Sequence, residues 1–241
     1  MHERDKFSIE PLYAQVRRHL ADRISSGVWS PGSVLPNEQE LARELGVSPG
    51  TVRKALDILE AAKLVTRRQG KGTFVLDQAS QELAVRFSNI RDGDGQRIVG
   101  DMELLTREKA AASSRERDKL RLDPDEQVVR LVRVRRHEAQ PFMYEEVSLP
   151  LSRFRGLDDS GAENDRITAL AQRHGIHLAR SSEQVGMVEA ASPVAAHLNV
   201  AAGTPLLKLD RVITATDGLP VEWRIGLCHL GEKMLYLGEV G

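Results

Sequence analysis

The chain has 241 residues, of which 41% are hydrophobic and 29% are charged, enough for a packed core in one large or two ordinary domains. A net charge of -1 excludes a uniformly basic nucleic-acid coat protein but not a local basic patch. The single cysteine excludes a disulfide framework and a thiolate cluster for zinc or iron–sulfur. No apolar run reaches the roughly 18 residues of a membrane span, and the charged start Met1–Lys6 is unlike a signal peptide. We therefore expect a cytoplasmic protein with no membrane partner.

Residues 8–76 predict a small domain of helices that ends in a hairpin. Apolar side chains recur at every fourth position from Leu12 to Ile24, which gives the first helix one buried face. Asn37, followed three residues later by Glu40, is a capping-box variant that opens a second helix, and Gly46 ends that helix.

A third helix follows at once, with Ser48 as its cap and Pro49 at its first position. The three-residue turn of residues 46–48 predicts a helix-turn-helix, whose recognition helix would enter the DNA major groove with residues 48–54. Two strand-like segments, 64–68 and 73–76, then flank a glycine-containing tip and predict a β-hairpin.

Positive charge is concentrated on these last two elements. Residues 49–76 contain six basic and two acidic side chains, a local charge of +4 in a chain of net charge -1, as phosphate binding requires. Arg53 and Lys54 face away from the buried side of the third helix, and Gly50 and Thr51 are small enough for DNA to approach. The hairpin adds Arg67, Arg68 and Lys71. A helix-turn-helix can also be a simple packing unit, and paired arginines can be a solvated face, but their order and spacing favour DNA binding.

Residues 77–81 are polar and predict a linker, and residues 82–241 predict a second domain that mixes helices and strands. Segments 86–90 and 96–99 around a turn at 92–95 are typical of a hairpin, and 113–120 and 167–174 of helices. The second domain also contains an internal repeat: residues 119–134 align without a gap on 197–212, and each copy then returns through a proline, Pro141 or Pro220. Each copy predicts a helix, a turn, a strand and a returning strand, hence an α+β domain with an antiparallel sheet and pseudo-two-fold symmetry.

Two arginines of this domain are candidates for ligand binding. Arg133 and Arg135 lie on one face of a predicted strand, where they repel each other unless an anion lies between them. That anion is either a bound ligand or a carboxylate of the protein, Glu145 or Glu146. Glu222 and Arg224 share a face of the symmetry-related strand.

Other chemistry has little support in the sequence. No Ser/His/Asp set is recognisable, and the seven histidines form no metal-binding spacing. Gly70–Thr73 lacks the register of a phosphate-binding loop, and Cys228 lies in an apolar stretch typical of a core residue. We expect no catalytic residues, no metal and no cofactor.

Residues 12–76 resemble the winged-helix domain of the GntR family of bacterial transcription regulators. The resemblance rests on the strings Leu35–Ala42, Thr51–Leu56 and Arg68–Val75, together with Pro31-Gly32 and Val47-Ser48. It implies an N-terminal winged helix-turn-helix in which the start of the second helix lies on phosphate and the wing near Gly70 contacts DNA. The DNA-binding candidates are Asn37, Gln39, Ser48, Pro49, Gly50, Thr51, Arg53, Lys54, Arg68, Gln69, Gly70 and Lys71. Family members often carry arginine where this chain has Gln39 and Pro49, so the base preference is not implied.

Residues from about 100 to 236 resemble the UTRA effector domain of the HutC branch of that family, through Leu131–Arg135, Gly203–Leu206 and Gly218–Glu222. The resemblance implies a chorismate-lyase-like α+β fold, and a lyase-like enzyme is the alternative function of a different class. The effector-binding candidates are Arg133, Arg135, Glu145, Glu222 and, more weakly, Arg224. The family often has a tyrosine-rich stretch where this chain has Ile225–His229, and a small hydroxyl residue near Asp165, which leaves the ligand open among small anions.

Together these features predict a ligand-responsive transcription regulator, most simply a repressor, with an activator as the alternative. We expect a homodimer, joined through the second domain, that binds an inverted-repeat operator because each half-site meets the same recognition helix. A small anionic metabolite would release it from DNA.

Overall fold

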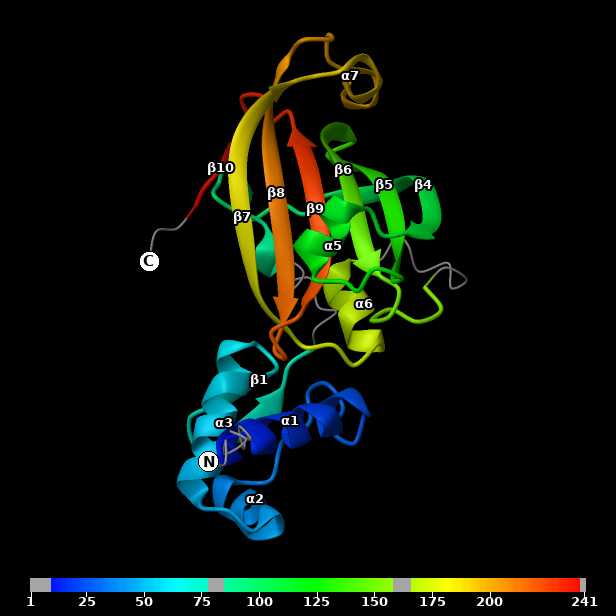
Figure 1. Ribbon diagram of the computed structural model, residues 1–241. Coiled ribbons are helices and arrows are strands. Elements are labelled where there is room, and N and C mark those ends of the chain that lie inside the picture. The colour runs from blue at the N-terminus through cyan, green and yellow to red at the C-terminus, as the bar shows by residue number, and fades with distance from the viewer. Residues whose placement is uncertain (1–9, 78–84, 158–165, 239–241) are drawn as a thin grey trace, which may run out of the picture. The chain divides into compact units, whose positions relative to one another are not determined.

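The computed structural model describes residues 10–77, 85–157 and 166–238, and the chain divides into two compact units, Met1–Gln78 and Ala79–Gly241 (Figure 1). Of the predicted linker, residues 78–81 lie outside the described residues, as does Asp165.

The first unit is a three-helix domain with a two-stranded wing. Its elements are α1 (Leu12–Ser25), α2 (Glu38–Leu45), α3 (Pro49–Ala61), β1 (Val65–Arg68) and β2 (Gly72–Val75). One core joins the helices and the wing, and it includes Leu20, Leu41, Leu56 and Val75, all almost fully buried. Burial of these side chains holds the wing against the helices, since apolar burial stabilises by roughly 1.5–3 kcal/mol per large side chain.

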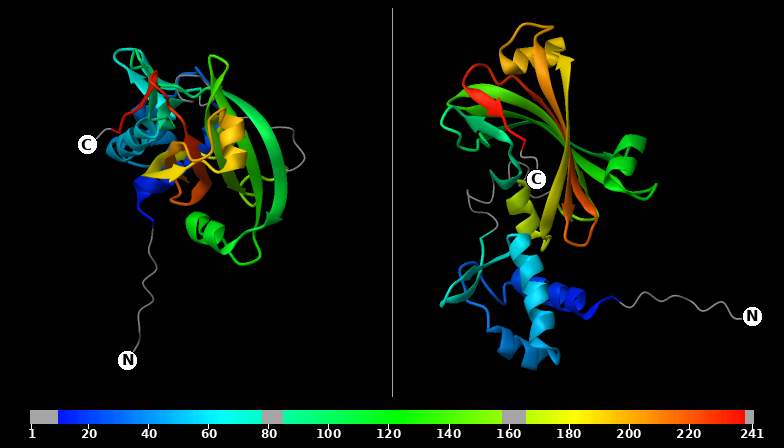
Figure 2. Two further views of the ribbon diagram at one scale, coloured as in Figure 1. Left: turned by 90° about the horizontal axis from the view of Figure 1, so that it is seen from above. Right: turned by 90° about the vertical axis from the view of Figure 1, so that its left-hand side faces the viewer.

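The second unit is built on one antiparallel sheet of six strands. In spatial order the strands are β4 (Asp101–Ala111), β5 (Gln127–His137), β6 (Gln140–Pro150), β9 (Pro220–Cys228), β8 (Pro205–Ala215) and β7 (Leu178–Glu189). The helices are α5 (Ser114–Leu120), α6 (Ile167–Arg173) and α7 (Ser192–Leu198). Figure 2 shows α5 on one face of the sheet, and α6 and a small two-stranded sheet on the other.

The predicted repeat is confirmed and is longer than the sequence indicated. Each half contributes a long strand, a short helix and two paired strands, in the order β4-α5-β5-β6 and β7-α7-β8-β9. Both short helices end on a residue in the left-handed conformation, Arg121 at φ 54 and Asn199 at φ 56, at equivalent positions of the repeat. The strands β4 and β7 were missed because they lie at the sheet's edges, where residues exposed on both faces, apolar as well as polar, remove the period-two pattern.

The hairpin predicted over residues 86–99 is confirmed around its turn, where residues 90–92 pair with 96–98, but its first part is not a strand and β3 has a second, distant partner. Residues Val85–Phe87 form a 3-10 helix, η1, and β3 (Ile90–Asp92) pairs with β10 (Met234–Tyr236) near the C-terminus. The turn itself is present: the Asp92 Oδ1 atom accepts hydrogen bonds from the backbone N–H groups of Asp94 and Gln96. The return segment makes a single bridge, between Arg91 and Arg97. The local sequence pattern predicts the turn, whereas the pairing of β3 with β10 depends on a segment far away in the chain.

Candidate DNA interface and effector pocket

The helix-turn-helix forms with the predicted caps. The Asn37 Oδ1 atom accepts hydrogen bonds from the backbone N–H groups of Gln39 at 3.0 Å and Glu40 at 2.9 Å, and the Glu40 carboxylate accepts from the Asn37 N–H. Gly46 ends α2 at φ 65, and the Ser48 Oγ atom accepts from the Thr51 N–H at the start of α3. The Asn37 side-chain oxygen is thus already engaged as a helix cap, which restricts its role toward DNA.

The remaining DNA-binding candidates lie on the surface of this unit. Thr51 is half-buried, and the others are exposed: Gln39, Ser48, Pro49, Gly50, Arg53, Lys54, Arg68, Gln69, Gly70 and Lys71. The Lys54 ammonium lies 3.9 Å from the centre of the Tyr13 ring, and the Arg68 guanidinium lies 4.6 Å from that of Phe74. These cation–π contacts hold both charges near the surface without neutralising them.

Arg67 differs from the other wing cations. Its guanidinium forms ion pairs with Asp57 at 2.6 Å and with Glu60 at 2.9 Å, both on α3. The local charge that the sequence assigns to the wing is therefore partly neutralised within the domain, and Arg67 joins the wing to α3.

Glu38, the first residue of α2, contacts both Arg53 of the recognition helix and Arg67 of the wing. Its Oε2 atom accepts two hydrogen bonds from Arg53, at 2.9 Å from Nε and 2.7 Å from Nη2, and its Oε1 atom lies 3.7 Å from Arg67 Nη2. The hydrogen bond and charge of Glu38 raise the pKa of Arg53, so the exposed guanidinium stays cationic.

In the second unit, one buried carboxylate collects three arginines. Glu145 is fully buried and accepts hydrogen bonds from Arg133 at 2.8 Å, Arg135 at 2.9 Å and Arg224 at 3.1 Å. Burial alone would raise the pKa of Glu145, but the three guanidinium groups outweigh it and hold that pKa far below its usual range. The anion between Arg133 and Arg135 is thus Glu145, while Glu146, the other candidate of the sequence, is exposed on the opposite face.

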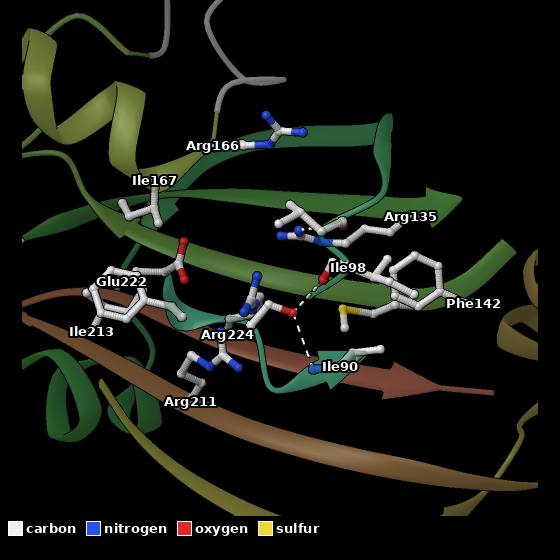
Figure 3. Close-up of a pocket in the computed structure, with 14 residues that line it drawn as sticks. Ile90, Ile98, Arg135, Phe142, Arg166, Ile167, Arg211, Ile213, Glu222 and Arg224 are labelled. Carbon is white, nitrogen blue, oxygen red and sulfur yellow. Dashed lines mark hydrogen bonds between the residues drawn. The ribbon is translucent and has the colours of Figure 1, made fainter. Parts of the chain in front are cut away.

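A pocket opens beside this cluster, between the sheet and the elements that cover it (Figure 3). It encloses about 40 Å³, room for a few water molecules, since one occupies roughly 10–15 Å³ on this measure. Of the five effector candidates, Arg135, Glu222 and Arg224 line the pocket, whereas Arg133 and Glu145 do not. The sequence reasoning missed Arg211 and Arg166, which also line it. Arg211 was detectable, because the repeat places it at the position equivalent to Arg133; Arg166 had no signal.

Two polar atoms in the pocket wall lack partners among the described residues. Glu222 is 2% exposed and its Oε1 atom is buried without a hydrogen bond, as is the Nε atom of Arg166. Arg211, by contrast, donates to Glu183 at 2.6 Å. A buried carboxylate oxygen without a donor costs free energy, about 1–3 kcal/mol or more, until water or a ligand satisfies it. In Figure 3 the Glu222 carboxylate and the Arg166 guanidinium flank the same space.

A second, larger pocket of about 260 Å³ adjoins the first. The two share Ile98, Val99 and Arg166, and the second is also lined by the basic side chains of Arg97, Arg136 and His137. A ligand longer than a few atoms has room to extend past Arg166 into this space.

Comparison with known proteins identifies both units. Residues 12–75 match the family of bacterial regulatory proteins called gntR, and residues 95–232, more than half of the chain, match the UTRA domain. The chain belongs to the GntR family and carries a UTRA domain. It is a ligand-responsive transcription regulator: GntR-family proteins bind operator DNA, and UTRA domains bind small-molecule effectors.

Relatives of similar length support this assignment. The uncharacterized HTH-type transcriptional regulator YurK of Bacillus subtilis is 31% identical over 227 residues, covering 92% of this chain and 93% of that protein. The probable fructoselysine utilization operon transcriptional repressor of Escherichia coli is 28% identical over 218 residues, 90% of each chain. The crystal structure of PhnF from Mycobacterium smegmatis superposes with a TM-score of 0.55 at 26% identity, covering 94% of this chain and 99% of that one. These names indicate regulators rather than enzymes, and the described helices of this GntR-family chain include none long and apolar enough to cross a membrane.

Proposed function

We propose that this GntR-family protein is a repressor that binds an inverted-repeat operator as a homodimer and is released by a small anionic effector. The observation that carries the proposal is the combination of an exposed cationic helix-turn-helix and wing with a buried, arginine-lined pocket whose polar groups are incompletely paired. A relative at 28% identity is named a repressor, which favours repression over activation.

For DNA binding, we assign base or phosphate contacts to Arg53 of α3 and to Arg68 and Lys71 of the wing. The backbone around Gly50 and Gly70 allows close approach, and Gln39, Thr51 and Gln69 add polar groups. Arg53→Ala is expected to weaken operator binding by about 1–3 kcal/mol, and Lys71→Ala to reduce the salt dependence by about one ion. Mobility shifts on the protein's own promoter at several salt concentrations measure both. Unchanged affinity and salt slope in two folded variants would contradict the assignment.

For effector binding, Arg135, Arg224 and Arg166 supply positive charge, because arginine binds carboxylate or phosphate in a bidentate manner. The Oε1 atom of Glu222 has no hydrogen-bond donor in the described part of the chain, so the effector carries a hydroxyl or ammonium group as well as its anion. Arg133 and Glu145 hold the other arginines in place. A thermal-shift screen of hydroxylated and aminated carboxylates and phosphates tests this, since a ligand at 100 times its Kd adds about 2.7 kcal/mol. Glu222→Gln should selectively weaken binding of whichever compound shifts the wild-type protein, whereas Glu146→Gln serves as the control. A compound that binds Glu222→Gln as tightly as it binds wild type would place the effector elsewhere.

We also propose that the UTRA domain binds its ligand without transforming it. Glu145 is held ionised by three arginines, and burial raises the pKa of the Cys228 thiol to about 12. Neither group is suited to transfer a proton or to attack a substrate near neutral pH.

The homodimer proposal is supported by a contrast between the two sheet edges. Edge strands expose unpaired backbone groups, and proteins protect them with charged residues. At the equivalent positions of the repeat, β4 carries Arg107 and Lys109 where β7 carries Val185 and Met187, which are 49% and 64% exposed. The segment 184–188 of β7 has no charged residue. Antiparallel pairing with a second copy, centred on Gly186, would place Val185 opposite Met187 of that copy.

A further inference from the structure

Arg53 presents only part of its guanidinium to solvent. Its Nε–Nη2 edge donates to Glu38 Oε2 at 2.9 and 2.7 Å, whereas its Nη1 atom makes no hydrogen bond to a described residue. The side chain is nevertheless 65% exposed. One edge of the planar group is therefore fixed on the protein, and the Nη1 end is left without a hydrogen bond in the described part of the chain.

The fixed edge is held from two sides. Glu38 begins α2 directly after the Asn37 cap, so the start of a hydrogen-bonded helix sets the position of its carboxylate. Arg67 approaches the other oxygen of Glu38 at 3.7 Å and donates to the Arg53 backbone carbonyl at 3.4 Å. The carboxylate thus links α2, the recognition helix and the wing.

We propose that Glu38 is a positioning residue that sets base specificity, by holding Arg53 so that its free edge reads guanine in the major groove. The proposal rests on the DNA contact of Arg53 proposed above. A guanidinium recognises guanine O6 and N7 with two parallel donors, which requires a defined orientation of its plane. A freely rotating arginine would serve phosphates equally well and would give affinity without specificity.

Glu38 carries negative charge into a surface proposed to meet phosphates. By charge alone its removal should strengthen binding to any DNA. A positioning role predicts that removal of Glu38 lowers the preference for the operator over other DNA. The loss of a repulsive charge alone would leave that preference unchanged, so the two effects can be separated.

The experiment compares full-length wild-type protein with Glu38→Gln and with Glu44→Gln. Glu44 is the matched control, because it lies on the same helix and pairs with Arg23. Each protein selects from a pool of random duplexes, and its affinity is then measured for the selected duplex and for an unselected one. We expect E38Q to lower the ratio of these affinities on the order of tenfold, with unselected DNA bound as well or better, and the guanine preference to be lost at one position of each half-site. E44Q should keep both the ratio and the preference.

Arg53→Lys provides a second variant, because lysine keeps the charge but has no second edge. It should show the same loss of preference, and E38Q should add nothing to it. An unchanged guanine preference in E38Q, or an equal fall for both duplexes, would overturn the positioning role. If Arg53→Ala leaves DNA binding unaffected, the failure lies instead in the proposed DNA contact. Should E38Q lower the melting temperature, R53K is compared with the double variant that also carries E38Q. An equal guanine preference in these two proteins supports the positioning role, and a further loss in the double variant contradicts it.

Discussion

At the scale of single residues, two adjacent glutamates have opposite environments. The sequence offers both Glu145 and Glu146 as carboxylate partners of Arg133 and Arg135, but alternation along β6 points Glu145 into the covered face and Glu146 to the other. The register places Glu145 directly opposite Arg133. One carboxylate therefore pairs with three buried cations, and the other is exposed.

This difference predicts the outcome of one pair of substitutions. Glu145→Gln leaves three buried guanidinium groups without their anion and should destabilise the second unit strongly, by about 3–5 kcal/mol. Glu146→Gln should change stability by less than about 0.5 kcal/mol. Thermal or urea unfolding measures both, and similar melting temperatures for the two variants would contradict the role of Glu145.

The same geometry gives Arg135 a structural role in addition to its proposed ligand contact. Seen as a ligand contact alone, Arg135→Ala would leave the melting temperature nearly unchanged. Because Arg135 is buried, bonds Glu145 and donates to the Val99 carbonyl at 3.1 Å, its removal should also destabilise the domain, by roughly 1–3 kcal/mol. The ligand responses of this variant and of the wild-type protein must therefore be compared at a temperature where both are folded.

At the scale of elements, the hairpin between β5 and β6 has a strained tip. His137 pairs with Gln140, so the loop has two residues, Glu138 at φ 49 and Ala139 at φ 64. Two positive φ values define a turn that favours Asn-Gly, and ordinary residues adopt it at a cost of about 1 kcal/mol each.

Replacement of the tip by the favoured pair should therefore stabilise the hairpin. Glu138→Asn with Ala139→Gly is expected to raise the free energy of unfolding by about 1 kcal/mol, less the entropy that glycine loses on folding. Chemical denaturation of the double variant and wild type measures this. A lower stability would mean that the Glu138 side chain, which lines the larger pocket, makes a contact worth more than the strain.

At the scale of the whole molecule, the internal repeat builds a sheet whose two edges differ in charge. Grafting the charges of β4 onto β7, as Val185→Arg with Met187→Lys, should convert the proposed dimer to monomer. Both side chains are exposed, so the fold should survive. Light scattering reports the mass, and Arg107→Glu with Lys109→Glu on β4 is the control expected to keep it. A wild-type monomer would refute the dimer itself, whereas a dimeric graft would refute only this edge.

The buried carboxylates also give the second unit a defined acid sensitivity. Burial alone would raise the pKa of Glu116, but hydrogen bonds from Arg130, Ser113 and Ser148 lower it to about 2. With an unfolded value near 4.3, ionised Glu116 stabilises the fold fully above about pH 4.3, and this contribution is lost as pH falls toward 2. Glu116→Gln should lower the melting temperature at pH 7 and flatten its decline between about pH 5 and 3. Parallel curves for wild type and variant would show that other groups dominate.

The sequence by itself determined the elements whose signals are local. Caps at Asn37 and Ser48, the stop at Gly46, the glycine tip of the wing and the spacing of apolar residues define α2, α3 and the hairpin from neighbouring residues alone. The resemblance to the GntR family also followed from short strings of residues, and the repeat predicted the α+β class of the second domain, although not its edge strands β4 and β7.

Only the tertiary structure decided which charges meet. Arg67 turns toward α3, Arg53 pairs with Glu38, and Glu145 gathers Arg133, Arg135 and Arg224. The entry of Arg166 into the pocket and the pairing of β3 with β10 likewise join segments far apart in sequence. The physical reason is that a charge selects its partner by distance and burial in three dimensions, and strand register and helix placement set both.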